Sequence, residues 1–134
     1  MANNDAAAVV LKFFELSAVG DMDACFALLA DNVTWTNIGS TRFSGTYTGK
    51  DAVINDLVGP LFGALKSGIE SNIDRVISEG DTAVVLQRGR SETHDGKAYT
   101  NDYAQVFTVH EGLIVAVKEY MDTALVDAVF GPAP

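Results

Sequence analysis

The first part of the chain carries apolar residues at helical spacing. One predicted helix has Asn4 or Asp5 as its N-cap and ends at Gly20. Its residues at helical spacing are Val9, Val10, Phe13, Phe14 and Ser17. A second predicted helix has Asp21 as its N-cap. Its apolar positions are Met22, Cys25, Phe26 and Leu29. The pattern therefore predicts two amphipathic helices at the start of the chain.

The next segment begins with a strand pattern. Residues 33–38 are β-branched and aromatic, which is typical of a strand, and the Gly/Ser/Thr-rich residues 39–49 predict a loop. Helical spacing resumes over residues 51–58. We expect a break at Pro60, because proline lacks an amide hydrogen and clashes with the preceding turn, and then a second short helical piece.

The remainder of the chain reads as a meander of long strands. The predicted strands are residues 72–78, 82–93, 97–109 and 113–121. Gly80-Asp81 and Glu111-Gly112 predict turns, and Asp95-Gly96 predicts a two-residue hairpin turn with positive φ at both positions. Asp122 can cap a closing helix that ends at Gly131.

This order of elements predicts an α+β fold. Strands of this length must twist and coil strongly. Helices packed on the concave side of such a curved antiparallel sheet leave a cone-shaped interior, so we expect an internal pocket. The chain contains no linker-like segment, and we expect one domain over residues 1–134.

Composition narrows the classes of partner. The chain has 134 residues, of which 48% are hydrophobic, and its apolar runs are too short for a membrane-spanning helix. The N-terminus lacks the features of a signal peptide, so we expect a cytoplasmic location. The net charge of −9 repels phosphate backbones and anionic lipid, so we expect no nucleic-acid or membrane partner. A neutral, apolar organic ligand stays compatible with this charge.

Metal ions and cofactors are not expected. Cys25 is the only cysteine, which excludes an internal disulfide, and its apolar setting predicts an inert buried thiol. The His, Asp and Glu residues show no metal-ligand spacing, and the glycines form no phosphate-binding motif.

Candidate chemistry comes from side chains that alternate along the predicted strands. One face of the long strand consists of Val84, Leu86, Arg88 and Arg90. One face of the returning strand consists of Tyr99, Asn101, Tyr103, Gln105 and Phe107. One face of the last strand consists of Leu113, Val115, Val117, Glu119 and Met121. Glu119 is the only charge in its row, so it must be at the surface, paired with a cation, or in a polar pocket.

Several of these residues have two interpretations. Glu119 is either a structural or solvent-facing residue, or a functional carboxylate paired with Arg88 or Arg90. Asp122 is either a helix N-cap or a proton carrier. Trp35 and Tyr47 are either core residues or pocket walls.

Short motifs spread over nearly the whole chain resemble one superfamily. They are VGDMD (19–23), LLADNVTW (28–35), YTGKDA (47–52), GKAY (96–99), VF (106–107), EGLI (111–114) and EYMD (119–122). Together they look like the SnoaL-like branch of the nuclear transport factor 2 superfamily, which also holds ketosteroid isomerases, limonene epoxide hydrolases, scytalone dehydratases and polyketide cyclases. The resemblance implies a cystatin-like α+β barrel, a conical pocket and a homodimer through the outer sheet face.

The residues of two related enzymes match only in part. The epoxide hydrolases use two acidic residues and an arginine to activate water. In this comparison Arg88 stands at the arginine position and Glu119 near one acidic position, whereas Arg90 stands at the other acidic position. Ketosteroid isomerases keep a general-base aspartate where this chain has Asn37, and an amide cannot accept the proton.

We therefore expect a small-molecule enzyme that uses cofactor-free acid–base chemistry of the isomerase, cyclase, dehydratase or hydrolase type. Its substrate is a largely apolar, oxygen-bearing molecule. The expected catalytic residues are Glu119, Arg88 and Asp122. The expected substrate-binding residues are Trp35, Asn37, Tyr47, Arg90, Asn101, Tyr103, Gln105 and Val117. The alternative is a non-catalytic module of the same fold that binds a ligand or a protein partner.

Overall fold

The computed structural model describes residues 5–134, which form a six-stranded sheet and a set of helices. The sheet order is β2-β1-β6-β5-β4-β3. The strands are β1 (Leu29–Asn37), β2 (Gly45–Thr48), β3 (Glu70–Glu79), β4 (Thr82–Glu92), β5 (Ala98–His110) and β6 (Leu113–Met121). The helices are α1 (Ala6–Ala18), α2 (Met22–Ala27), α3 (Lys50–Ala52), the π-helical η2 (Val53–Val58), α4 (Gly59–Gly63) and α5 (Thr123–Phe130).

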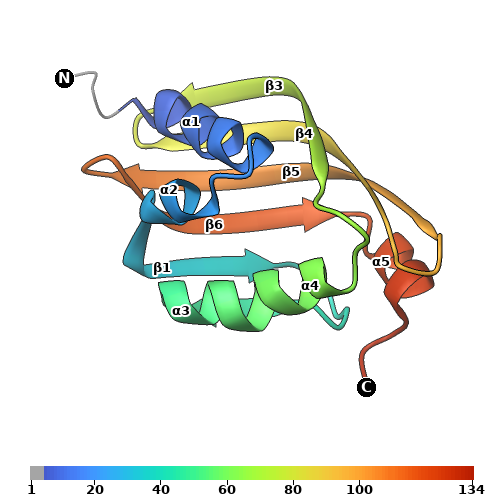
Figure 1. The fold of residues 1–134 in the computed structure, drawn as a ribbon. Coiled ribbons are helices and arrows are strands. Elements are labelled where there is room, and N and C mark those ends of the chain that lie inside the picture. Colours follow the sequence, from blue (N-terminus) through green and yellow to red (C-terminus); the bar gives the residue numbers. More distant parts are fainter. Residues whose placement is uncertain (1–4) are drawn as a thin grey trace.

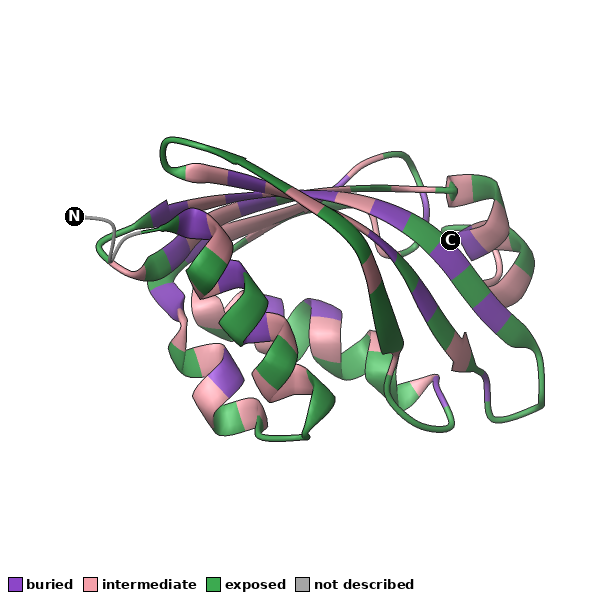
Figure 2. Ribbon diagram, turned by 90° about the horizontal axis from the view of Figure 1, so that it is seen from above, coloured by how far each residue is buried: buried purple, intermediate pink, exposed green. Residues whose placement is uncertain are grey.

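The sheet is strongly curved, and the helices from α1 to α4 lie on one side of it (Figure 1). The view from above shows these helices on the concave side of the bent strands (Figure 2). The α+β class is therefore confirmed, although the sheet does not close into a barrel because β2 and β3 stay at its two edges. No helix within residues 5–134 has the length and apolarity to cross a bilayer.

One strand pair departs from the expected antiparallel pattern. β1 and β6 run parallel, with Trp35 opposite Val117 and Asn37 opposite Glu119. The two strands come from opposite ends of the chain, so no tight turn forces them to run antiparallel. Their pairing places the end of β1 beside Glu119, which neither strand pattern indicated by itself.

Capping side chains fix the starts of three helices. Asp5 accepts from the Ala7 amide at 3.0 Å, which confirms it as the cap of α1, while Asn4 lies outside the described residues. Asp21 caps α2 and Asp122 caps α5, each over 3.2 Å. These positions follow from local sequence, because short oxygen-bearing side chains satisfy amides at a helix start.

The middle of the chain differs from the prediction in two places. Helical structure continues from α3 through η2 into α4, so the expected break at Pro60 is wrong. Pro60 lies in the first turn of α4, after the wide turns of η2, where a missing amide hydrogen costs little. The predicted loop of residues 39–49 contains β2, whose Tyr47 pairs with Trp35 of β1.

The hairpin between β4 and β5 also differs from the prediction. The Thr93 amide donates to the Lys97 carbonyl at 2.9 Å, so the loop has three residues rather than two. Gly96 has a φ of 88°, whereas Asp95 does not have a positive φ. A two-residue loop would have placed Arg88 opposite Tyr103, but the observed register places Gln87 there. Shifting the register by one residue exchanges the two faces of β4, because side chains alternate along a strand.

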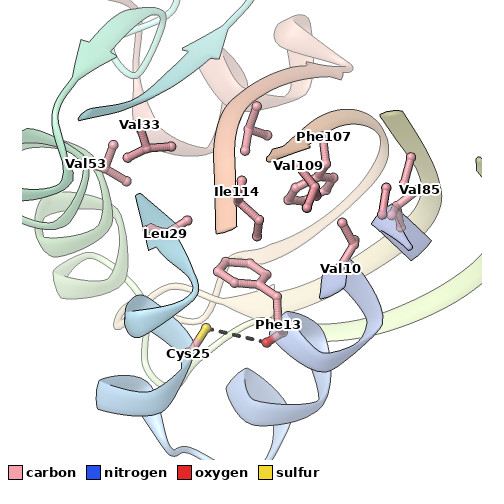
Figure 3. Packing of buried hydrophobic residues seen from close by; sticks show 13 residues of the cluster. Val10, Phe13, Cys25, Leu29, Val33, Val53, Val85, Phe107, Val109 and Ile114 are labelled. Carbon is pink, nitrogen blue, oxygen red and sulfur yellow. Dashed lines mark hydrogen bonds between the residues drawn. The ribbon is translucent and has the colours of Figure 1, made fainter. Parts of the chain in front are cut away.

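The hydrophobic core lies between the sheet and helices α1, α2 and η2 (Figure 3). Phe107 of β5 is fully buried and packs against Phe13, Phe14 and Trp35, with ring centroids 5.9 to 6.2 Å away. The Cys25 thiol also lies in this core and donates to the Phe13 carbonyl at 3.5 Å. Phe13, Phe14 and Trp35 of this aromatic cluster also line a cavity.

Candidate functional site

A cavity of about 130 Å³ lies between the concave face of the sheet and helices α1, α2, η2 and α4. Much of its wall is apolar and includes Phe13, Phe14, Met22, Phe26, Leu57 and Leu61. Its main polar groups come from the sheet and are Trp35, Asn37, Gln87, Tyr103, Gln105 and Glu119. A mostly apolar hollow with a few convergent polar groups is typical of a small-molecule site.

Glu119 is the only ionisable acid or base from residues 5–134 in this lining besides the Cys25 thiol and the Tyr103 phenol. Its Oε1 atom accepts from the Trp35 indole at 3.1 Å and from the Gln105 amide at 3.2 Å. Among the described residues, no hydrogen bond involves its second oxygen. One oxygen is therefore held in place, while the other is available to a ligand.

The environment of Glu119 favours its neutral form. Loss of solvation raises the pKa of the carboxyl group, and the hydrogen bonds from Gln105 and Trp35 offset part of this rise. Within residues 5–134 no Lys, Arg or His forms a salt bridge with Glu119. A carboxyl group of this kind can carry a proton closer to neutral pH than an exposed one can.

A chain of amides extends from Glu119 across the sheet. Gln105 donates to Glu119, and Gln87 in turn donates to the Gln105 carbonyl oxygen at 2.7 Å. The Oε1 atom of Gln87 is buried and has no hydrogen-bond partner within residues 5–134. An unpartnered buried acceptor costs about 1–3 kcal/mol, so a ligand hydroxyl or amide group that reached it would stabilise the complex.

Asn37 and Tyr103 also line the cavity, and each is held by hydrogen bonds. The Trp35 indole is shared with Asn37, whose Oδ1 atom lies 3.2 Å away, and Asn37 donates to the Phe43 carbonyl at 3.0 Å. The Tyr103 hydroxyl donates to the Tyr99 hydroxyl at 2.9 Å. Burial raises the pKa of Tyr103 far above its usual range, so this phenol stays protonated.

The structure places both predicted arginines outside the cavity. Arg88 lies on the outer face of β4 and forms a two-point ion pair with Asp102, its Nε atom lying 2.8 Å from a carboxylate oxygen. Arg90 is exposed on the same face. The expected contact between Glu119 and either arginine is therefore wrong, and the cause is the one-residue register difference in the β4–β5 hairpin.

Four other predicted site residues lie outside the cavity lining, where they cap a helix, form hydrogen bonds or pack in the core. Asp122 is exposed, caps α5 and does not line the cavity, which agrees with the helix N-cap interpretation. Asn101 is buried and holds the start of α5 through two bonds with the Asp122 backbone, of 3.0 and 3.1 Å. Tyr47 donates to the Phe43 carbonyl, and Val117 lies in the core; neither lines the cavity.

The remaining predicted site residues all line the cavity, whereas the glutamine at the end of the amide chain was not predicted. Trp35, Asn37, Tyr103, Gln105 and Glu119 all line the cavity. Gln87 lines it too, although it lies on the face of β4 opposite to the predicted site residues Arg88 and Arg90. The signal that would have found Gln87 is the register of the hairpin, since residues directly opposite each other share one face of a sheet.

The geometry suits proton transfer to and from a neutral organic molecule. Most of the cavity wall is apolar, and Glu119 offers one carboxyl oxygen that has no hydrogen-bond partner within residues 5–134. Gln87 and Tyr103 are the nearby groups that could orient a substrate oxygen or hydroxyl. The arrangement lacks a charged partner for an anionic ligand among the lining residues of the described chain.

Comparisons with known proteins agree with this fold. The SnoaL-like domain profile matches residues 10–117. No curated protein matches the chain. An NTF2-like protein of unknown function from Burkholderia pseudomallei is similar in structure, with 25% identity, a TM-score of 0.83, and coverage of 96% of this chain and 98% of that one.

Two further solved structures show the same fold at lower identity. A candidate SnoaL-like polyketide cyclase from Jannaschia sp. CCS1 is 16% identical, with a TM-score of 0.80 and coverage of 96% of this chain and 93% of that one. TerC, crystallised with polyporic acid, is 18% identical, with a TM-score of 0.81 and coverage of 92% and 96%. Because the domain profile spans most of the sequence, the chain belongs to the SnoaL-like domain family.

Proposed function

We propose that the protein is a cofactor-free enzyme that moves a proton on a small, largely apolar, oxygen-bearing substrate. Glu119 is the proton carrier. In this mechanism its free carboxylate oxygen takes a proton from a carbon next to a substrate carbonyl, which leaves an enolate. The same carboxyl then returns the proton at another atom, so the net reaction is an isomerisation or a ring closure of the substrate without any external reagent.

The observation that carries this proposal is the position of Glu119: a desolvated carboxyl, held by two donors on one oxygen, at the wall of an apolar cavity. A buried structural carboxylate would be expected to have a cation or more donors as partners. Tyr103 is the candidate group for orienting the substrate oxygen.

Membership of the SnoaL-like family supports the proposal at the level of class only. TerC was crystallised with polyporic acid, so a solved protein of this fold has been studied with a small organic molecule.

The test is hydrogen–deuterium exchange at carbon, because a general base at Glu119 must exchange acidic C–H groups of a bound ketone. Cyclohexanone and cyclohexenone suit a cavity of about 130 Å³. We expect the wild type to accelerate exchange in D₂O, as followed by proton NMR, and Glu119→Gln to abolish it. Glu79→Gln, which changes an exposed carboxylate at the end of β3, is the matched control and should keep it.

Equal exchange rates for the wild type and both variants would overturn the catalytic role of Glu119. Ligand binding is measured in parallel by thermal shift. Stabilisation of Glu119→Gln by the same ketones would show that the variant still folds and binds, so that loss of exchange reports on the proton carrier alone.

One observation favours a non-catalytic binding module instead. The Tyr103 hydroxyl is already engaged with Tyr99, and the cavity lining within residues 5–134 holds no second carboxyl or imidazole. A thermal shift with every ketone, but without exchange or product, is the result that this alternative predicts.

A further inference from the structure

A second hollow adjoins the mouth of the cavity. It is an open groove of about 920 Å³ between the end of α1, the turn before α2, α4 and the start of β3. Six residues line both the groove and the cavity: Phe14, Ser17, Met22, Phe62, Ile69 and Ser71. The two hollows therefore adjoin each other along these shared residues.

The groove gathers exposed apolar side chains. Six large hydrophobic residues of the described chain are exposed: Leu11, Val19, Phe62, Ile77, Leu113 and Tyr120. Three of them line this groove, with exposed fractions of 44% for Leu11, 74% for Val19 and 36% for Phe62. Single exposed hydrophobic residues are ordinary, but a cluster beside the opening of a cavity is typical of a binding surface.

The small volume of the inner cavity limits how much of a substrate it can hold. A closed apolar cavity of about 150 Å³ holds one benzene molecule, and the inner cavity here is of that order. Ligand sites usually measure about 300–1,000 Å³. A substrate larger than a single ring must therefore extend beyond the inner cavity, and the groove is the hollow that adjoins it.

Charge limits what the outer part of that substrate can be. Glu15 and Glu70 line the groove, and no Lys, Arg or His of residues 5–134 does so. The whole chain also carries a net charge of −9. An anionic group at the outer end would be repelled, whereas a neutral or cationic group would not.

We propose that the groove is a second binding subsite, which holds an apolar chain attached to the ring in the inner cavity. The substrate class is thus a single ring with a hydroxyl or carbonyl group beside Glu119 and an apolar extension, whose outer end is neutral or cationic. This inference rests on the proposed function, because it takes the inner cavity as the site of the reacting ring.

The test compares phenol with para-propylphenol and para-pentylphenol by calorimetric titration. Each methylene that the groove buries should tighten binding about fourfold, since burying one CH₂ contributes about 0.8 kcal/mol. In Leu11→Ser/Val19→Ser each methylene should tighten binding about twofold or less, because the variant buries less than half of its apolar surface. The affinity for phenol itself should not change in that variant.

The matched control is Ile77→Ser/Leu113→Ser, which removes two exposed apolar side chains away from the groove. It should keep the full dependence on chain length. Circular dichroism verifies that both double variants fold. An equal loss of chain-length dependence in the control would overturn the assignment of the groove.

A second arm tests charge, with a para-alkylphenol that ends in an amine against one that ends in a carboxylate. The amine should bind more tightly, and Glu15→Gln/Glu70→Gln should remove the difference. If phenol binds but neither chain length nor end charge matters, the groove proposal fails while the inner site stands. If phenol and the ketones all fail to bind, the proposed function fails, and the groove proposal fails with it.

Discussion

Replacing Glu119 with glutamine should stabilise the protein at neutral pH, and the gain should depend on pH in a defined way. The amide keeps an oxygen that can accept from Trp35 and Gln105, so the two observed hydrogen bonds have a counterpart in the variant. What the substitution removes is the cost of an ionised carboxylate in a desolvated site.

The sign follows from proton binding. Desolvation raises the pKa of Glu119 in the folded state above that in the unfolded chain, which is about 4.3. Between these two pKa values the folded protein keeps a proton that the unfolded chain has released. The stability of the wild type therefore falls as pH rises through this window, by up to about 1.4 kcal/mol per pH unit relative to the variant.

The assay is urea unfolding of both proteins over a series of pH values. Subtracting the two curves cancels the contributions of the other seventeen acidic residues, since both proteins share them. The difference should be constant below about pH 4, rise in favour of Glu119→Gln, and level off at the folded pKa. It should persist in high salt, because partly buried charges are screened much less than exposed ones.

A difference that stays flat across this range, or that narrows as pH rises, would refute the reasoning. The first result would mean that the carboxyl is solvated in the folded protein. The second would mean that its pKa is lowered by a partner, and the proton-carrier role would lose its electrostatic basis.

Three further predictions concern other parts of the site. Arg88→Gln should leave ketone binding and exchange unchanged and should alter stability little in urea unfolding, because its ion pair is exposed. A loss of exchange as large as that in Glu119→Gln would contradict this. Gly89→Ala should destabilise by about 1–3 kcal/mol in urea unfolding and reshape the cavity, since its Cβ would lie 2.8 Å from Ile69 and 3.0 Å from Tyr103. Burial raises the pKa of the Cys25 thiol to about 11, so a thiol reagent should label it slowly in the native state and rapidly in urea; fast native labelling would show an open core.

Local chemistry made much of the secondary structure predictable from the sequence. The helix caps Asp5, Asp21 and Asp122 and the last strand, Leu113–Met121, lie where the pattern placed them. Each cap depends on a side chain and an amide two or three residues away, so no distant contact is needed to specify it. Glu119 was also recognisable from local sequence, because it is the one charged residue in an apolar row of the last strand.

The faces of the strands were not predictable in the same way. Along β4, the even-numbered residues through Arg88 and the odd-numbered residues through Gln87 both contain apolar side chains. The choice between them depends on whether the hairpin loop holds two or three residues. Asp95-Gly96 is compatible with both, and the bond from Thr93 to Lys97 selects the longer loop.

By itself, the sequence determined an α+β domain, its helix caps and a lone carboxyl on an apolar strand face. The tertiary structure decided which residues share the cavity with that carboxyl: it brought Gln87 and Trp35 to Glu119 and turned Arg88 outward. The physical reason is that a strand alternates with a period of two, so a single loop residue moves every side chain of β4 from one face to the other.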